Sequence, residues 1–160
     1  AEAAGLEDRI AVRLGDGLSC LAPDEADDIV IAGMGGETIA AILDAAPWVR
    51  APRYLLVLQP MTRPEKLRGY LLTHGFAIRE ECVVEDGTHL YTVMTAVYTG
   101  DPPVYDEAAW YRGALGTTGK PFLKKEIRRL HQQEKGRRLA GLTEEADRLV
   151  RLIRQLEESL

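Results

Sequence analysis

The sequence predicts an α/β fold in which a mostly parallel sheet ends in an antiparallel hairpin and is followed by a pair of helices. Three observations support this prediction. A continuous apolar run at 29–32 ends in Gly33, Gly35 and Gly36, and a helix-forming run follows at once. Extended and helical runs alternate up to residue 98, and beyond Asp101-Pro102-Pro103 the pattern is helical. Such alternation is typical of parallel sheets, whose buried strands read as unbroken apolar runs.

Each element of the sheet region has its own signal. Pro64 favours the first turn of a helix, and Gly75 favours its end. Only four residues join the last two extended runs, so these runs should pair antiparallel. The expected elements are the tail of a helix over 1–6 ending at Gly5, a strand over 9–14 with a turn at 15–17, a strand over 28–34, a helix over 37–46, a strand over 54–58 stopped by Gln59-Pro60, a helix over 64–74, and two extended runs over 76–85 and 90–98.

The C-terminal region predicts an antiparallel α-helical coiled-coil hairpin. Two apolar seams have helical spacing, and Gly141 can turn the chain between them. Thr143 is the expected N-cap of the second helix. We therefore expect two domains, 1–100 and 101–160. The seams consist of Leu123, Ile127 and Leu130 on the first helix and of Ala146, Leu149, Ile153, Leu156 and Leu160 on the second.

Composition limits the class of protein. The chain has 160 residues, 46% hydrophobic and 28% charged, which suits one globular domain with an appendage. No apolar run approaches the ~18 residues of a membrane helix, so we expect no membrane partner. Cys20 and Cys82 lack CxxC spacing, which indicates neither a metal site nor a disulfide framework. A reduced, cytoplasmic setting is the expectation.

Charge is distributed unevenly along the chain. The net charge is −5, yet residues 110–139 carry nine lysines and arginines against two glutamates. A basic block in an acidic protein is typical of a surface that binds a polyanion such as RNA, and a solvated helix face is the alternative. The candidate RNA-binding residues are Lys120, Lys124, Lys125, Arg128, Arg129, Arg137 and Arg138.

Candidate ligand-binding residues lie at the ends of the predicted parallel strands, where open α/β sheets bind their ligands. Asp16, between Gly15 and Gly17, could accept a hydrogen bond from an adenine amino group, or could form a simple Asx turn. Gln59 could use its paired donor and acceptor to bind a nucleobase edge, or could face water. Pro60 follows it at the same strand end.

The glycine segment 33–36 does not match the dinucleotide fingerprint. That fingerprint needs a third glycine, where this chain has Thr38, and an acid on the next strand, which is absent. The segment 116–120 lacks P-loop spacing and is expected to be a flexible connector. The three histidines form no catalytic pairing, although the turn that carries His89 could overhang the crevice.

Several segments together resemble the bacterial tRNA (adenine-22-N1)-methyltransferase family. They are Val12-Arg-Leu-Gly-Asp-Gly-Leu18, Ile29-Val-Ile-Ala-Gly-Met-Gly-Gly-Glu37, Leu56-Val-Leu-Gln-Pro60, Leu67-Arg-Gly-Tyr-Leu-Leu-Thr-His-Gly-Phe76, and Glu85-Asp-Gly87 with Tyr91. The resemblance implies a partial Rossmann-like class I methyltransferase sheet of order 3-2-1-4-5-7-6, in which 9–14 is the third strand. It also implies S-adenosylmethionine (SAM) as cofactor and tRNA as partner.

The resemblance also suggests roles for residues. It matches Gly15, Asp16 and Gly17 to the SAM adenine contact, and Gly33, Met34, Gly35 and Gly36 to the cofactor loop. It places Gly33, Gly35, Gln59 and Pro60 around the transfer point. Nothing here matches the family's first strand, with its Asp-x-Gly segment, or the second. We therefore expect an N-terminally truncated fragment that is inactive by itself.

The reaction implied for the parent enzyme is methyl transfer to N1 of adenine 22, by direct in-line displacement. Because N1 has a lone pair, the main tasks are alignment and removal of a proton. The alternatives are a SAM-dependent methyltransferase acting on another RNA or a small molecule, and a non-enzymatic RNA-binding or interaction module. A monomer or weak homodimer is expected.

Overall fold

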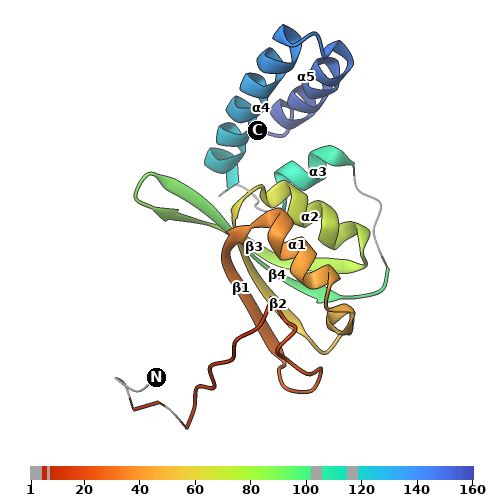
Figure 1. The fold of residues 1–160 in the computed structure, drawn as a ribbon. Helices are drawn as coiled ribbons and strands as arrows, with labels where there is room; N and C mark the ends of the chain where they lie inside the picture. Colours follow the sequence, from red (N-terminus) through yellow and green to blue (C-terminus); the bar gives the residue numbers. More distant parts are fainter. Residues whose placement is uncertain (1–4, 7, 102–105, 115–118) are drawn as a thin grey trace.

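The structure is a computed structural model that describes residues 5–6, 8–101, 106–114 and 119–160. The structure contains a four-stranded sheet. Figure 1 shows that the sheet is twisted, with helices on one face and further helices beyond one end. The strand order is β1-β2-β4-β3. The predicted helix tail at 1–6 and the predicted connector at 116–120 fall largely outside the described residues.

The parallel part of the sheet confirms the strand–helix–strand prediction. Strand β1 (Asp28–Gly35) pairs parallel with β2 (Leu55–Thr62). Helix α1 (Gly36–Asp44) and the short helix η2 (Pro47–Val49) connect them. Alternate strand residues face the helices because side chains in a strand point to opposite faces. The resulting core includes Ile29, Ile31, Leu56 and Leu58 from the strands, and Ile39 and Leu43 from α1.

Strand β2 does not stop at Gln59-Pro60, as the sequence predicted, but continues to Thr62. Pro60 has no N–H, yet it pairs with Met34 at a point where the β1–β2 register shifts. An irregular ladder tolerates proline because one hydrogen bond is already missing there. Gln59 and Pro60 therefore lie within β2, near its end, and not in the loop that follows it.

Helix α2 (Pro64–Thr73) and the terminal hairpin agree with the prediction. Strands β3 (Phe76–Asp86) and β4 (His89–Tyr98) pair antiparallel along their whole length. Strand β4 also pairs antiparallel with β2, but only as far as Leu58 opposite Met94. The tip of the hairpin therefore extends beyond the sheet as a separate arm (Figure 1).

The predicted strand over 9–14 is wrong. These residues have no regular structure, and Val12 is 86% exposed. A strand forms only against a neighbour, and in the order that the resemblance implies the third strand pairs with the second. No described residue of this chain supplies that second strand. In Figure 1 the segment runs away from the sheet as an extended tail.

Three helices follow the sheet. Helix α3 (Glu107–Arg112), which the sequence analysis did not predict, is capped by the Asp106 carboxylate and contacts both α2 and α5. Helices α4 (Lys120–Leu139) and α5 (Thr143–Glu157) pack on each other after a turn at Gly141, which has φ +76°. Thr143 is not the N-cap: α5 begins at that residue and no side chain caps it. Glu144 and Glu145 instead complement the helix dipole.

Candidate functional site

The rim of the sheet has an open position at Gly33. This residue has φ +80°, and an added Cβ would meet no atom within 4 Å. Its N–H donates to Oε1 of Gln59 at 2.8 Å, so the end of β1 is tied to the end of β2. The Gln59 amide nitrogen in turn contacts the Met61 sulfur at 3.5 Å. Gln59 therefore supports the rim, and its carbonyl is already engaged.

Gly35 and Gly36 differ from Gly33 because they are packing positions. An added Cβ on Gly36 would lie 2.3 Å from the Arg63 carbonyl oxygen, and one on Gly35 would lie 3.2 Å from the Thr62 hydroxyl. Both glycines let the start of α1 lie against the end of β2. The structure thus brings the glycine segment together with Gln59 and Pro60, as the sequence analysis expected.

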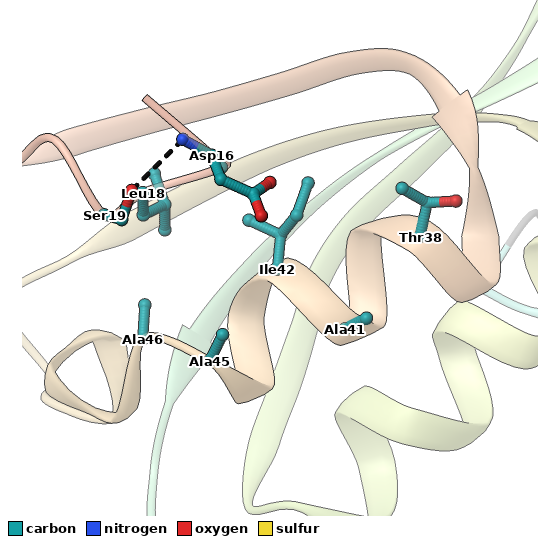
Figure 2. Close-up of a pocket in the computed structure, with 9 residues that line it drawn as sticks. Asp16, Leu18, Ser19, Thr38, Ala41, Ile42, Ala45 and Ala46 are labelled. Carbon is teal, nitrogen blue, oxygen red and sulfur yellow. Dashed lines mark hydrogen bonds between the residues drawn. The ribbon is translucent and has the colours of Figure 1, made fainter. Parts of the chain in front are cut away.

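A hollow lies beside Asp16. It has a volume of about 230 Å³ and lies between the 16–19 turn and α1 (Figure 2). The Asp16 N–H donates to the Ser19 hydroxyl at 3.1 Å, so Ser19 holds the turn. Figure 2 shows the Asp16 carboxylate on the side of the turn that faces α1. No described residue forms a hydrogen bond with that carboxylate, which leaves it available to a ligand.

An ion pair between residues on either side of the 16–19 turn closes the loop that carries Asp16. Arg13 binds both carboxylate oxygens of Glu25 at 2.7 Å, and the Ala22 N–H donates to the same carboxylate at 2.6 Å. The Arg13 side chain and then the Ala22 N–H stabilise the charged form, so they lower the pKa of Glu25 from 4.5 to about 2.

The titration of Glu25 gives a pH prediction. Because the folded pKa is depressed, the stabilisation of the loop is complete above pH 4.5 and is lost as the pH falls toward 2. We expect the amide chemical shift of Ala22, measured by NMR, to titrate with a midpoint of about 2. Glu25→Gln should abolish this titration. A midpoint at the ordinary glutamate value would contradict the ion pair.

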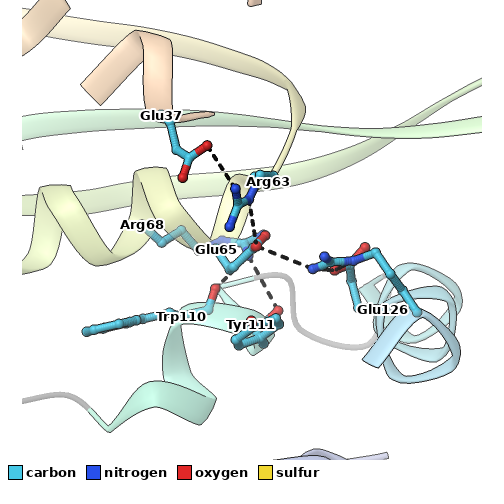
Figure 3. A network of polar contacts seen from close by, with 8 residues as sticks. Glu37, Arg63, Glu65, Arg68, Trp110, Tyr111 and Glu126 are labelled. Atoms are coloured by element: carbon cyan, nitrogen blue, oxygen red, sulfur yellow. Dashed lines mark hydrogen bonds and ion pairs between the residues drawn. The ribbon is translucent and has the colours of Figure 1, made fainter. Parts of the chain in front are cut away.

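A chain of charged groups joins the rim to α4 (Figure 3). Arg63, which has φ 54°, contacts Glu37 at 2.9 Å and Glu65 at 3.8 Å. Glu65 is only 3% exposed and contacts Arg129 of α4 at 3.3 Å. Burial, with the Glu65 charge as a second cause, raises the pKa of Tyr111 beside this cluster to about 12. Sequence analysis missed Arg63 and Glu65, whose only signal was two charges flanking Pro64 at a strand end.

The basic block is divided by the structure into paired and unpaired cations. The paired ones bind carboxylates or a carbonyl within the chain: Arg129 with Glu65 and Glu126, Arg137 with Glu145, Arg138 with Glu134 and Asp147, and Lys120 with the Leu160 carbonyl. Among the described residues, four exposed members have no such partner, namely Lys124, Lys125, Arg128 and Lys135. These four are the ones free to bind an anion.

Metal sites and membrane-spanning helices are absent from the described part of the chain. It contains no group of three acidic, cysteine or histidine side chains that could hold a metal ion. None of its helices is both long and apolar enough to cross a membrane. His74, His89 and His131 lie at the end of α2, at the start of β4 and in α4, and each is exposed.

Comparison with known proteins gives consistent similarities. The family model described as "Methyltransferase domain" matches residues 1–94. The tRNA (adenine(22)-N(1))-methyltransferase of Bacillus subtilis (strain 168) is 38% identical over 125 residues, which are 78% of this chain and 51% of that protein. The chain therefore spans about half the length of this curated relative.

Solved structures share the fold. A protein of the NADB-Rossmann superfamily from Streptococcus agalactiae matches 98% of this chain and 70% of its own, with a TM-score of 0.80 and 27% identity. The B. subtilis M1A22 tRNA methyltransferase matches 97% and 73%, with a TM-score of 0.77 and 27% identity. A putative tRNA (m1A22) methyltransferase from Streptococcus pneumoniae, in complex with S-adenosyl-L-methionine, matches 98% and 71%, with a TM-score of 0.73 and 28% identity.

Proposed function

The chain belongs to the methyltransferase-domain family, and from this premise we propose that its protein transfers a methyl group from SAM to N1 of adenine 22 in tRNA. The similarity to the B. subtilis enzyme is the observation that carries the proposal, because it covers most of this chain at 38% identity. The open rim at Gly33, beside Gln59 and Pro60, supports it from the geometry.

The described residues fit one side of a SAM site. Gly15, Asp16 and Gly17 offer a free carboxylate beside a hollow, which suits the adenine end of the cofactor. Its volume of about 230 Å³ is below the ~300 Å³ of a typical complete ligand pocket. The segment Gly33, Met34, Gly35 and Gly36 would border the methionine end. When bound, SAM supplies an activated methyl group on its sulfonium.

The remaining chemistry is alignment. Adenine N1 attacks with its own lone pair, so the protein gains most by holding the base in line with the methyl carbon. Gly33 leaves space for close approach, and the Gly33–Gln59 hydrogen bond keeps the two strand ends at a fixed separation. Gly35 and Pro60 fix the backbone around them. A base in folded tRNA must first be unstacked to reach this position.

We propose that 1–100 and 101–160 act as two domains, the second being a coiled-coil pair that binds tRNA. Separate hydrophobic clusters support this division, one around the sheet and one joining α3, α4 and α5. The free thiols of Cys20 and Cys82 suit the reduced cytoplasm, where tRNA is found. The apolar seams of α4 and α5 are compatible with a monomer or a weak homodimer.

A labelling assay tests the proposed function. The product of the complete reading frame that contains these residues is incubated with radioactive SAM and a tRNA transcript that has adenine at position 22. We expect label to enter this tRNA and not a transcript with guanine at that position. The 160-residue chain alone should transfer none. Equal labelling of the two transcripts, or of free nucleosides, would favour another substrate.

The RNA-binding residues are tested by charge removal on α4. We expect Lys124→Gln with Arg128→Gln to weaken tRNA binding and to lower the log–log salt slope by about two, because each phosphate contact contributes about one. Arg138→Gln is the control, since Arg138 already binds Glu134 and Asp147. A larger slope change for Arg138→Gln than for the pair would contradict the proposed surface.

A further inference from the structure

The tip of the β3–β4 hairpin forms an arm that the proposed function does not use. The arm is defined here as residues 82–93, the part of the hairpin beyond the last β2–β4 pair at Met94. In Figure 1 it projects from the same side of the sheet as the first turns of α4. It is paired within itself and largely exposed, so most of its side chains have no packing role.

Two parallel rings lie on this arm. The rings of His89 and Tyr91 have centroids 6.0 Å apart and planes 13° apart. Residues two apart in a strand point to the same face, so the two rings form one surface. Tyr91 lines a hollow that is also lined by Met61, the residue that contacts Gln59. The arm therefore reaches the end of β2, next to Gln59.

The arm and α4 form two walls of one hollow. Its volume is about 200 Å³, and it begins at Pro60, one residue beyond Gln59. Tyr91 and Thr92 line it from the arm, and Phe122 and Lys125 line it from α4. Thr92 is 1% exposed and its hydroxyl has no partner among the described residues, an arrangement that costs about 1–3 kcal/mol until a partner is supplied.

The charges in this corner favour a nucleotide. Lys125 is exposed and has no carboxylate partner in the described part of the chain, so it can bind a phosphate. The arm itself carries the exposed acids Glu85 and Asp86, which repel phosphate. An RNA strand lying here would turn its backbone toward α4 and its bases toward the arm. Aromatic rings hold unstacked bases in that orientation.

We propose that the corner between the arm and α4 binds the nucleotide next to the target adenine, with its base stacked on the His89–Tyr91 pair and its phosphate at Lys125. This site rests on the proposed function, because the target base occupies the rim at Gly33. It would hold the neighbouring nucleotide while the adenine is unstacked, and would thereby position the target for transfer.

The experiment measures tRNA affinity with the full reading-frame product. The RNAs are intact tRNA and two forms that lack the base immediately before or after the target adenine. With the unchanged protein, we expect one of the two abasic tRNAs to bind roughly tenfold more weakly than intact tRNA. Tyr91→Leu should bind intact tRNA about tenfold more weakly than the unchanged protein does. The same variant should bind the abasic tRNA less than about twofold more weakly than it binds intact tRNA.

His89→Ala serves as a second variant, since its side chain is exposed and its removal leaves the core intact. The matched control is His74→Ala, which breaks a similar stack on Tyr70, 4.1 Å between centroids, at the other end of α2. This control should still bind the abasic tRNA roughly tenfold more weakly than intact tRNA, which is the full abasic penalty. The same full penalty in Tyr91→Leu and His89→Ala, or no penalty in the unchanged protein, would overturn the subsite. If the unchanged protein methylates tRNA in that case, the proposed function stands. If it neither binds nor methylates tRNA, the proposed function itself fails.

Discussion

Glu81→Ala is expected to lower the free energy of unfolding by about 3–5 kcal/mol, the typical cost of leaving a buried charge unpaired. The Glu81 and Arg68 side chains are 0% and 1% exposed, with 2.6 Å between the carboxylate and the guanidinium. Arg68 also donates to the Trp110 carbonyl at 2.7 Å, so this pair fastens α3 to the sheet. Removing the carboxylate leaves the guanidinium enclosed without a counter-charge.

Urea denaturation measures this effect, and the neighbouring residue supplies a control. Glu80 is exposed, so Glu80→Ala should change the unfolding free energy by less than about 0.5 kcal/mol. Replacing both partners, with Arg68→Met and Glu81→Leu, should recover much of the loss because no charge is then buried. A loss below about 1 kcal/mol for Glu81→Ala would show that the ion pair does not fasten α3.

Gly36→Ala is expected to destabilise the protein by about 3 kcal/mol, the upper range for overpacking a core. The added Cβ would lie 2.3 Å from the Arg63 carbonyl oxygen, and backbone atoms cannot rotate away. The start of α1 and the end of β2 would have to separate, which also moves the rim at Gly33. We therefore expect methyl transfer by the reading-frame product to fall more steeply than stability alone accounts for.

Gly136→Ala is the matched control for this substitution. Gly136 lies inside α4, and an added Cβ there meets no atom within 4 Å. Replacing it should raise the unfolding free energy by roughly 0.5–1 kcal/mol, because alanine loses less backbone entropy in a helix. Thermal unfolding of the two variants should thus shift in opposite directions. A neutral Gly36→Ala would mean that the close contact with Arg63 is not needed.

The parts of the fold that sequence predicted well are those with local signals. The apolar run before Gly33, the proline at position 64 and the turn after Asp86 each specify their element through neighbouring residues. The seams at Leu123 and Ile153 likewise predicted the two paired helices. Periodicity and turn chemistry need no distant partner to be recognised.

The predicted elements were wrong or missing where an element depends on residues far away in the sequence. The segment at 9–14 has strand-forming residues, but it has no described neighbour to pair with. Strand β2 continues through Pro60 because β1 shifts register beside it. Helix α3 was missed because its six residues depend on the Asp106 cap and on Arg68 beneath it. The missing strand partner, the register shift and Arg68 lie outside any short sequence window, whereas the Asp106 cap next to α3 is a local signal that the sequence analysis missed.

The sequence by itself determined that an apolar strand ends in a glycine segment, and that a basic block follows the sheet, since both are local properties of the chain. Only the tertiary structure decided which glycine is open, which cations are free and which rings stack on each other. Gly33 is open because no atom lies within 4 Å of an added Cβ, and Gly36 is closed because the Arg63 carbonyl occupies that space. Lys125 is free and Arg129 is not because Glu65 comes from another element, and such partners are fixed by packing.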